Sequence, residues 1–105
     1  MIANTPKPPY YAVIFSSLLN DAIEGYAETA EEMENLAKKQ PGYLGFESGR
    51  SEIGISVSYW KDLDSIRAWR NHMDHSEAIK KGKEQWYHSY FVRICKVERD
   101  YGFEI

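Results

Sequence analysis

The side chains best suited to chemistry in this chain of 105 residues gather in its second half. They are Trp69, Arg70, His72, His75 and Trp86. An indole ring can stack on a flat ligand, and a histidine imidazole can bind iron or carry a proton near neutral pH. Together these residue types indicate a site for a flat ligand in which a proton is moved or iron is bound.

Structural roles compete with these chemical ones. Trp69 falls in line with Leu63 and Ile66 on one side of a predicted helix, which is the pattern of a core residue. Arg70 fits a solvated helix face as well as contact with an anionic ligand. His88 stands at the entry to a predicted strand, where we expect it to be exposed. The sequence contains no HExxH motif, cysteine cluster or glycine-rich nucleotide loop, so we expect no metal site and no nucleotide cofactor.

The composition is that of one ordinary globular domain with an excess of aromatic rings. Hydrophobic residues make up 43% of the chain and charged residues 28%. The net charge of −3 argues against a nucleic-acid partner or an anionic membrane surface, because both require a basic excess. Aromatic residues, at 14%, are numerous enough to fill a core, line a site for a flat ligand or build a subunit interface.

The single cysteine and the N-terminus bear on where the protein works. Cys95 cannot form an internal disulfide, which favours a reducing compartment and predicts a cytoplasmic protein. It stands in a strand-like run, where we expect a buried free thiol rather than a nucleophile. Residues 1–9 are polar and rich in proline, so we expect a flexible segment before a single domain over residues 10–105. No apolar run is long enough to span a membrane.

The first half of the chain predicts a strand, a helix and a second strand. Residues 10–19 are rich in β-branched and aromatic side chains, which favours a strand. Asn20 suits the N-cap of a helix over residues 21–40, where apolar side chains recur at helical spacing. A Pro-Gly pair then ends the helix before a strand over residues 43–50.

The second half predicts a strand, a broken helix and a last strand. Strict alternation over residues 53–60 indicates a third strand, which a short polar link joins to the second as a hairpin. Asp62 or Asp64 caps a second helix. We expect this helix to break at residues 71–76, and a short helical piece over 76–83 to follow.

With a last strand over residues 87–101, the order is β-α-β-β-α-β. This order predicts an α+β, ferredoxin-like fold with a four-stranded antiparallel sheet. Two helices can cover only one face of such a sheet, yet the first strand is apolar in both its rows, which begin at Tyr11 and Ala12. Because a monomer rarely exposes that much apolar surface, we expect a second copy to cover the other face in a homodimer.

Three short segments carry a resemblance to a known family. They are Pro41-Gly42-Tyr43-Leu44-Gly45-Phe46, Ser58-Tyr59-Trp60-Lys61-Asp62 and Ala68-Trp69-Arg70. Together they resemble the antibiotic biosynthesis monooxygenase superfamily, small proteins that pair into a dimeric α/β barrel. The resemblance extends roughly from Tyr11 to Tyr101, and it implies a ligand site between the helices and the sheet of each subunit.

The resemblance implies oxidation of a small aromatic substrate, quinol- or polyketide-like, by molecular oxygen without a metal or flavin. Such chemistry needs an aromatic cage, a hydrogen-bond donor for a developing oxyanion and a base for a phenolic proton. His75 is our candidate base, and Tyr26 or Arg70 a candidate donor. The residues expected to form the cage are Phe15, Tyr59, Trp60, Trp69 and Trp86.

Two other functions remain open. The heme-degrading branch of the superfamily combines an Asn on the first strand, a Trp on the second helix and an iron-binding His. Trp69 matches, but Phe15 or Ser16 stands at the place of the Asn. The place of the His falls on Ala78 and Ile79, with His75 about one helical turn too early. A site without an effective base would instead make the protein a non-catalytic module that binds a small ligand.

Overall fold

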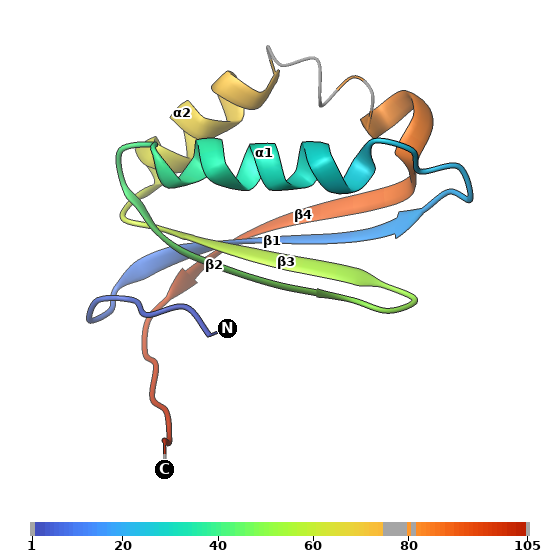
Figure 1. Cartoon of the computed structure of the whole chain (residues 1–105). Coiled ribbons are helices and arrows are strands. Elements are labelled where there is room, and N and C mark those ends of the chain that lie inside the picture. Colours follow the sequence, from blue (N-terminus) through green and yellow to red (C-terminus); the bar gives the residue numbers. More distant parts are fainter. Residues whose placement is uncertain (1, 75–79, 81, 105) are drawn as a thin grey trace.

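The computed structural model describes residues 2–74, 80 and 82–104. Its strands form one antiparallel sheet in the order β2-β3-β1-β4, and both α-helices lie on one face of it (Figure 1). Along the chain the elements are β1 (Tyr10–Leu19), α1 (Tyr26–Lys38), β2 (Tyr43–Arg50), β3 (Gly54–Trp60), α2 (Leu63–Asp74), the π-helical turn η1 (Gly82–Trp86) and β4 (Tyr87–Val97). The predicted ferredoxin-like order is confirmed.

The pleat of the central strands decides which side chains meet the helices. β1 and β3 pair from Tyr11 opposite Trp60 to Ser17 opposite Gly54. Successive side chains of a strand point to opposite faces, so each strand presents one row to the helices and one row away from them. On the helix side, β3 carries Gly54, Ser56, Ser58 and Trp60. On the open side it carries Ile55, Val57 and Tyr59.

The core on the helix side is centred on Trp60, which is fully buried. Ala37 of α1 and Ile66 of α2 are buried against it, and Tyr11 of β1 packs beside them. The indole N–H of Trp60 donates to Ser58 Oγ over 2.8 Å, so burial leaves this polar atom paired. One large side chain at the end of β3 therefore joins both helices to the sheet.

Helix α1 begins at Tyr26, and the prediction that it starts at Asp21 is wrong. Gly25 precedes it with φ at +83°, a left-handed backbone conformation that glycine adopts without strain. Asn20 does not cap this helix. Its backbone N–H donates to the carbonyl of Trp86 over 2.7 Å, and its side-chain amide to that of Gln85 over 3.1 Å. Hydrogen bonds to η1 therefore fix the segment that follows β1, and α1 begins only after this segment.

Helix α2 starts where the sequence placed it and runs further than predicted. Asp62 is the cap, because its Oδ1 accepts from both the N–H and the hydroxyl of Ser65, over 2.8 and 2.7 Å. The helix continues to Asp74, so the predicted break at residue 71 is wrong for 71–74. The rest of the expected break and most of the short helix over 76–83 lie outside the described residues; residues 82–86 form the π-helical turn.

Strand β4 ends at Val97 rather than at residue 101 as predicted. Val97 pairs with Tyr10, the first residue of β1, and Pro9 before it has no N–H with which to extend the ladder. Residues 98–104 have no regular structure and run away from the body on the open side (Figure 1). The missing pairing partner explains the early end of the strand.

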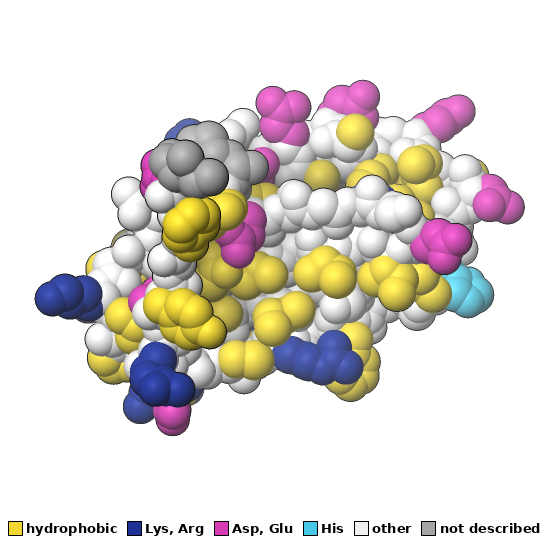
Figure 2. Space-filling model, turned by 90° about the horizontal axis from the view of Figure 1, so that it is seen from below, with side chains coloured by type: hydrophobic (Ala, Val, Ile, Leu, Met, Phe, Trp, Pro, Cys, Tyr) yellow, Lys and Arg dark blue, Asp and Glu magenta, His cyan; other side chains and the backbone are white. Residues whose placement is uncertain are grey.

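The open side of the sheet is largely apolar. Figure 2 looks onto it and shows a band of hydrophobic side chains across the strands. Ile55 is 48% exposed and Phe91 61% exposed. Cys95 is exposed as well, so the prediction of a buried thiol is wrong: it stands in the open-side row of the edge strand β4. The accessible area of the chain is 8011 Å², against about 6,000 Å² for a folded monomer of this mass.

One end of the open side is polar and holds the N-terminal segment. The Ala3 N–H donates to one carboxylate oxygen of Glu47 over 2.9 Å, and the Tyr59 hydroxyl to the other over 2.5 Å. The Tyr59 hydrogen bond, followed by that of Ala3, lowers the pKa of Glu47 below its ordinary value of 4.5. Burial and the same carboxylate raise the pKa of Tyr59, so the phenol remains a donor at neutral pH.

We expect the change Tyr59→Phe to raise the pKa of Glu47 toward 4.5, because the largest stabiliser of its charged form is removed. A carboxyl whose pKa is lowered on folding stabilises the fold above its unfolded pKa, and this stability is lost as the pH falls through the folded pKa. The stability difference between the wild type and Tyr59→Phe should therefore be larger at pH 7 than at pH 3. NMR titration of Glu47, with urea unfolding at both pH values, measures this. Tyr101→Phe, at a fully exposed ring, is the control, and an ordinary pKa for Glu47 in the wild type would contradict the prediction.

Candidate functional site

A floor of small side chains lies on the helix side of β3. Gly54, Ser56 and Ser58 follow one another in the row that ends at Trp60. Ser56 and Ser58 are only half-buried, although they stand on a central strand on the face that the helices cover. A flat ligand can approach such a floor closely, because no bulky side chain rises from it, and the serine hydroxyls offer hydrogen bonds.

The first aromatic group stands at the Trp60 end of this floor. Trp60 and Trp69 are stacked, with ring centroids 6.1 Å apart and planes at 25°, and Tyr43 meets Trp60 edge-on at 5.7 Å. We call these three residues the tryptophan stack. The exposed imidazole of His72 stacks on the Trp69 ring, with the two ring centroids 5.6 Å apart. The structure thus brings together the predicted cage residues Trp60 and Trp69.

The second aromatic group stands at the other end and includes three further predicted residues: Phe15, Tyr26 and Trp86. Tyr26 meets Trp86 at 5.9 Å and Tyr87 at 5.8 Å, both edge-on. Phe15 meets Tyr87 at 5.4 Å and stacks on Tyr90 at 5.3 Å. We call these five residues the tyrosine cluster. Sequence reasoning missed Tyr87 and Tyr90, whose only signal was their position at the start of a strand beside the first one.

Tyr87 is the residue of the tyrosine cluster whose pKa is shifted most strongly. Burial raises its pKa most, and a hydrogen bond with Tyr26 raises it further, whereas the positive charge of Arg50 opposes the rise. The phenol is therefore neutral at physiological pH. A half-buried neutral phenol such as that of Tyr87 can donate a hydrogen bond to an oxygen that gains negative charge.

Arg50 brings a positive charge to the tyrosine cluster, and sequence reasoning missed it. Its guanidinium carbon lies 5.8 Å from the centre of the Tyr26 ring. One nitrogen donates to the Ser17 carbonyl over 3.3 Å, and another to the Ser17 hydroxyl. Gly54 lies between the two, since it pairs with Arg50 on one side and with Ser17 on the other. The signal was available in the sequence as a glycine opposite an arginine in a hairpin.

The remaining predicted residues are not part of these groups. Arg70 lies on the outer surface of α2, where its side chain is 71% exposed and stands 3.9 Å from the carboxylate of Asp74. His88 is an exposed residue of β4. Tyr59 faces the open side of the sheet rather than the helices. His75, the candidate base, lies outside the described residues, so its role stays a prediction.

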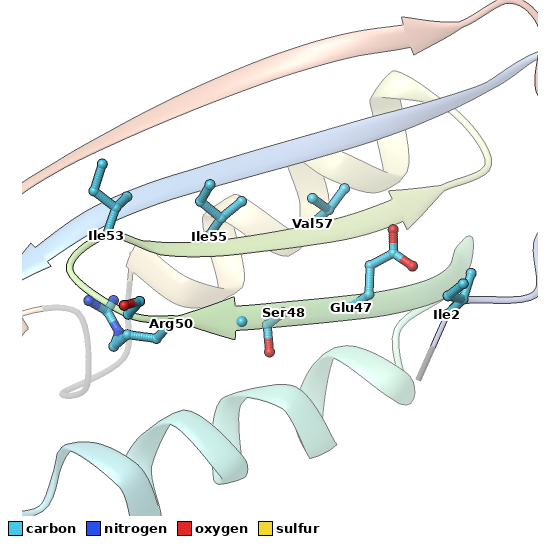
Figure 3. A pocket seen from close by; sticks show the side chains of 9 residues that line it. Ile2, Glu47, Ser48, Arg50, Ile53, Ile55 and Val57 are labelled. Carbon is cyan, nitrogen blue, oxygen red and sulfur yellow. The ribbon is translucent and has the colours of Figure 1, made fainter.

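The described residues form two surface hollows. The larger, of about 760 Å³, runs along β2 and β3 and is lined by Arg50 as well as by Ile53, Ile55 and Val57, which point to the same side as Glu47 (Figure 3). The smaller, of about 320 Å³, lies beside Trp86. Within the described residues we find no group of three side chains placed to bind a metal ion, and no helix of the length and apolarity that a membrane span requires. The cytoplasmic location and the single-domain division stay predictions.

We expect Trp69→Ala to lower the free energy of unfolding by less than Trp60→Ala, which should cost about 3–5 kcal/mol as a fully buried Trp. Trp69 is half-buried, so part of its ring is free for a ligand. The same change should weaken binding of a flat quinol or anthrone, measured by calorimetry. Urea unfolding at one protein concentration compares the two variants. Equal losses of stability with ligand binding unchanged would show that Trp69 serves packing alone.

The comparisons with known proteins agree with the fold. The family model for antibiotic biosynthesis monooxygenases matches residues 9–81. The uncharacterized protein YqjZ of Bacillus subtilis (strain 168) is 51% identical over 105 residues, which cover 98% of this chain and 92% of that protein.

Solved structures with low sequence identity share the fold. SnoaB, a cofactor-independent oxygenase from Streptomyces nogalater, superimposes with a TM-score of 0.71 at 11% identity, covering 89% of this chain and 97% of that one. A dimeric ferredoxin-like protein from Thermobifida fusca YX gives a TM-score of 0.66 at 13% identity, covering 92% and 100% of the two chains. The family match extends over most of the domain and includes the floor and the tryptophan stack. The chain belongs to the antibiotic biosynthesis monooxygenase family.

Proposed function

We propose that this protein is a monooxygenase that oxidises a small aromatic compound, quinol- or polyketide-like, with molecular oxygen and without a metal or flavin. The observation that carries the proposal is the pair of aromatic groups at the two ends of the small-residue floor. A flat ring lying on Ser56 and Ser58 would have the tryptophan stack at one end and the tyrosine cluster at the other. Aromatic walls with a few polar groups are typical of sites for small flat ligands.

The chemistry asks three things of the protein. A base must take the phenolic proton, so that the electron-rich substrate can pass electrons to oxygen. A donor must stabilise the negative charge that develops on the substrate oxygen, and we assign this task to the phenols of Tyr26 and Tyr87, which contact each other in the tyrosine cluster. The aromatic rings must keep water away from the reactive intermediate. We assign the first task to His75.

The family supports this proposal at the level of reaction class. SnoaB is described as a cofactor-independent oxygenase, and it shares the fold of this chain. At 11% identity that likeness concerns the fold, and function on a shared fold depends on the side chains of the site. The substrate must therefore be identified by experiment.

Oxygen uptake with a quinol or anthrone, together with a hemin titration, tests the proposal. We expect oxygen consumption by the colourless protein and no Soret band on addition of hemin. A Soret band with oxygen-dependent hemin breakdown would instead indicate the heme-degrading branch. Trp69 matches the Trp that this branch has on its second helix. Stabilisation by the ring compound without oxygen uptake would indicate a binding module.

We expect His75→Ala to abolish most of the oxygenase activity, by about 10²–10⁴-fold, because it removes the general base. His72→Ala and His88→Ala should leave the activity largely intact, since both side chains are exposed. Initial rates of oxygen uptake measure the effect. Unchanged activity in His75→Ala with lowered stability would assign His75 a structural role.

We also propose that the protein is a homodimer in which two open sides face each other. The apolar side chains on this face, the groove along β3 and the large accessible area of the single chain all support a partner surface. The Thermobifida fusca protein with the same fold is described as dimeric. Two-fold pairs are the commonest homo-oligomers, and an obligate interface buries about 2,000 Å² or more.

A charge placed on the open side should separate the subunits. Ile55→Glu puts a carboxylate in the open-side row of the central strand β3, at a side chain that is 48% exposed, where a partner would desolvate it. Sedimentation at micromolar concentration should show a dimer for the wild type and a shift toward monomer for Ile55→Glu. The matched control is Ile23→Glu, 40% exposed in the segment before α1, which should remain dimeric. A stable, well-folded wild-type monomer would contradict the proposal.

A further inference from the structure

Arg50 carries a positive charge that the described part of the chain does not neutralise. None of the ion pairs among the described residues includes it. A guanidinium has five N–H donors, and two nitrogens of Arg50 donate to Ser17. Donors remain for a further acceptor, and an acceptor with negative charge would form the strongest bonds.

Arg50 is an exposed residue, but its guanidinium is held in place by hydrogen bonds. Ser17 is only 3% exposed, and both its carbonyl and its hydroxyl accept from Arg50. The arginine reaches Ser17 by crossing Gly54: a Cβ at that position would overlap the guanidinium. A long side chain that is already fixed loses less conformational entropy when a ligand binds, so the entropic cost of binding is lower.

The guanidinium also borders the aromatic end of the floor. It lies over the Tyr26 ring, at 5.8 Å, and Tyr26 in turn contacts Tyr87. In the neighbouring cross-strand row stand Ser48, Ser56 and Phe15, which face the same side as Arg50. A ring compound on this floor would therefore place one edge near the charge and its faces near the aromatic side chains.

We propose that Arg50 is an anion-binding residue of the ligand site, and that the aromatic compound bound there carries a carboxylate. This inference rests on the proposed function, because it takes the helix side of the sheet as the site of the ring. The planar fork of an arginine matches the two oxygens of a carboxylate, which a single hydroxyl or amide cannot do. Arg50 thus selects among aromatic compounds rather than taking part in the oxidation.

Two probes of equal shape test this selectivity: 2-naphthoate and its neutral counterpart 2-naphthamide. Calorimetric titration of the wild-type protein at pH 7 should show binding of the naphthoate about tenfold or more tighter than the naphthamide, as expected for a charge-assisted pair. The preference should shrink in 0.5 M salt, because Arg50 is exposed and salt screens its charge. The naphthamide also reports whether each variant still has a folded site.

Three variants locate the preference. Arg50→Gln should abolish it, and so should Gly54→Ala, which keeps the charge but displaces the guanidinium from its place. The matched control is Arg67→Gln, at an arginine that is 70% exposed on α2 and paired with Asp64. It should retain the preference, because the same net charge is lost far from the floor.

The outcomes separate the two proposals. A preference that survives in both Arg50→Gln and Gly54→Ala would overturn the role of Arg50 and leave the proposed oxygenase untouched. Loss of folding in Arg50→Gln, with the preference intact in Gly54→Ala, would assign Arg50 to holding the hairpin and overturn the role as well. If the wild type binds neither probe, the ring site itself is wrong and both proposals fall.

Discussion

The structure depends on the alternation of side chains along its two central strands. β1 carries apolar residues on both faces and β3 carries them on its open side, but the two α-helices among the described residues lie on the same side of the sheet (Figure 1). Each face must nevertheless be removed from water for the fold to be stable. On the helix side this is achieved by Trp60 and the residues packed on it. On the open side, Ile55 and Phe91 remain exposed in the single chain. A dimer is the simplest way to meet this constraint.

The same alternation creates the candidate site. Because β3 directs Ile55 and Val57 to the open side, its helix side is left with Gly54, Ser56 and Ser58. Side chains this small rise little from the sheet on the face that the helices cover. The aromatic groups at its two ends supply walls, and Gly54 gives the Arg50 guanidinium room to cross to Ser17. The proposed subunit interface and the proposed ligand site thus lie on opposite faces of one strand.

Much of the fold could be predicted because its signals are local. The bounds of the first two strands agree with the expected ranges, since β-branched runs and turn residues act over a few positions. The Asp62 cap was one of two candidates, and the structure selects it. The start of α1 could not be predicted, because Asn20 is held by η1, more than sixty residues away in the chain. The early end of β4 likewise depends on where its partner begins.

For the site, the sequence by itself determined which residues are available, namely the aromatic rings and the serine row of β3. It also indicated the family of the chain. Only the tertiary structure decided which row faces the helices. The pleat places alternate side chains of a strand on opposite faces of the sheet. Which face the helices cover depends on how the helices pack, and the helices are distant from the strand in the sequence. The tertiary structure also places Tyr59 and Arg70 away from the aromatic groups and places Arg50 beside Tyr26. Such placements follow from packing between elements, which local periodicity does not encode.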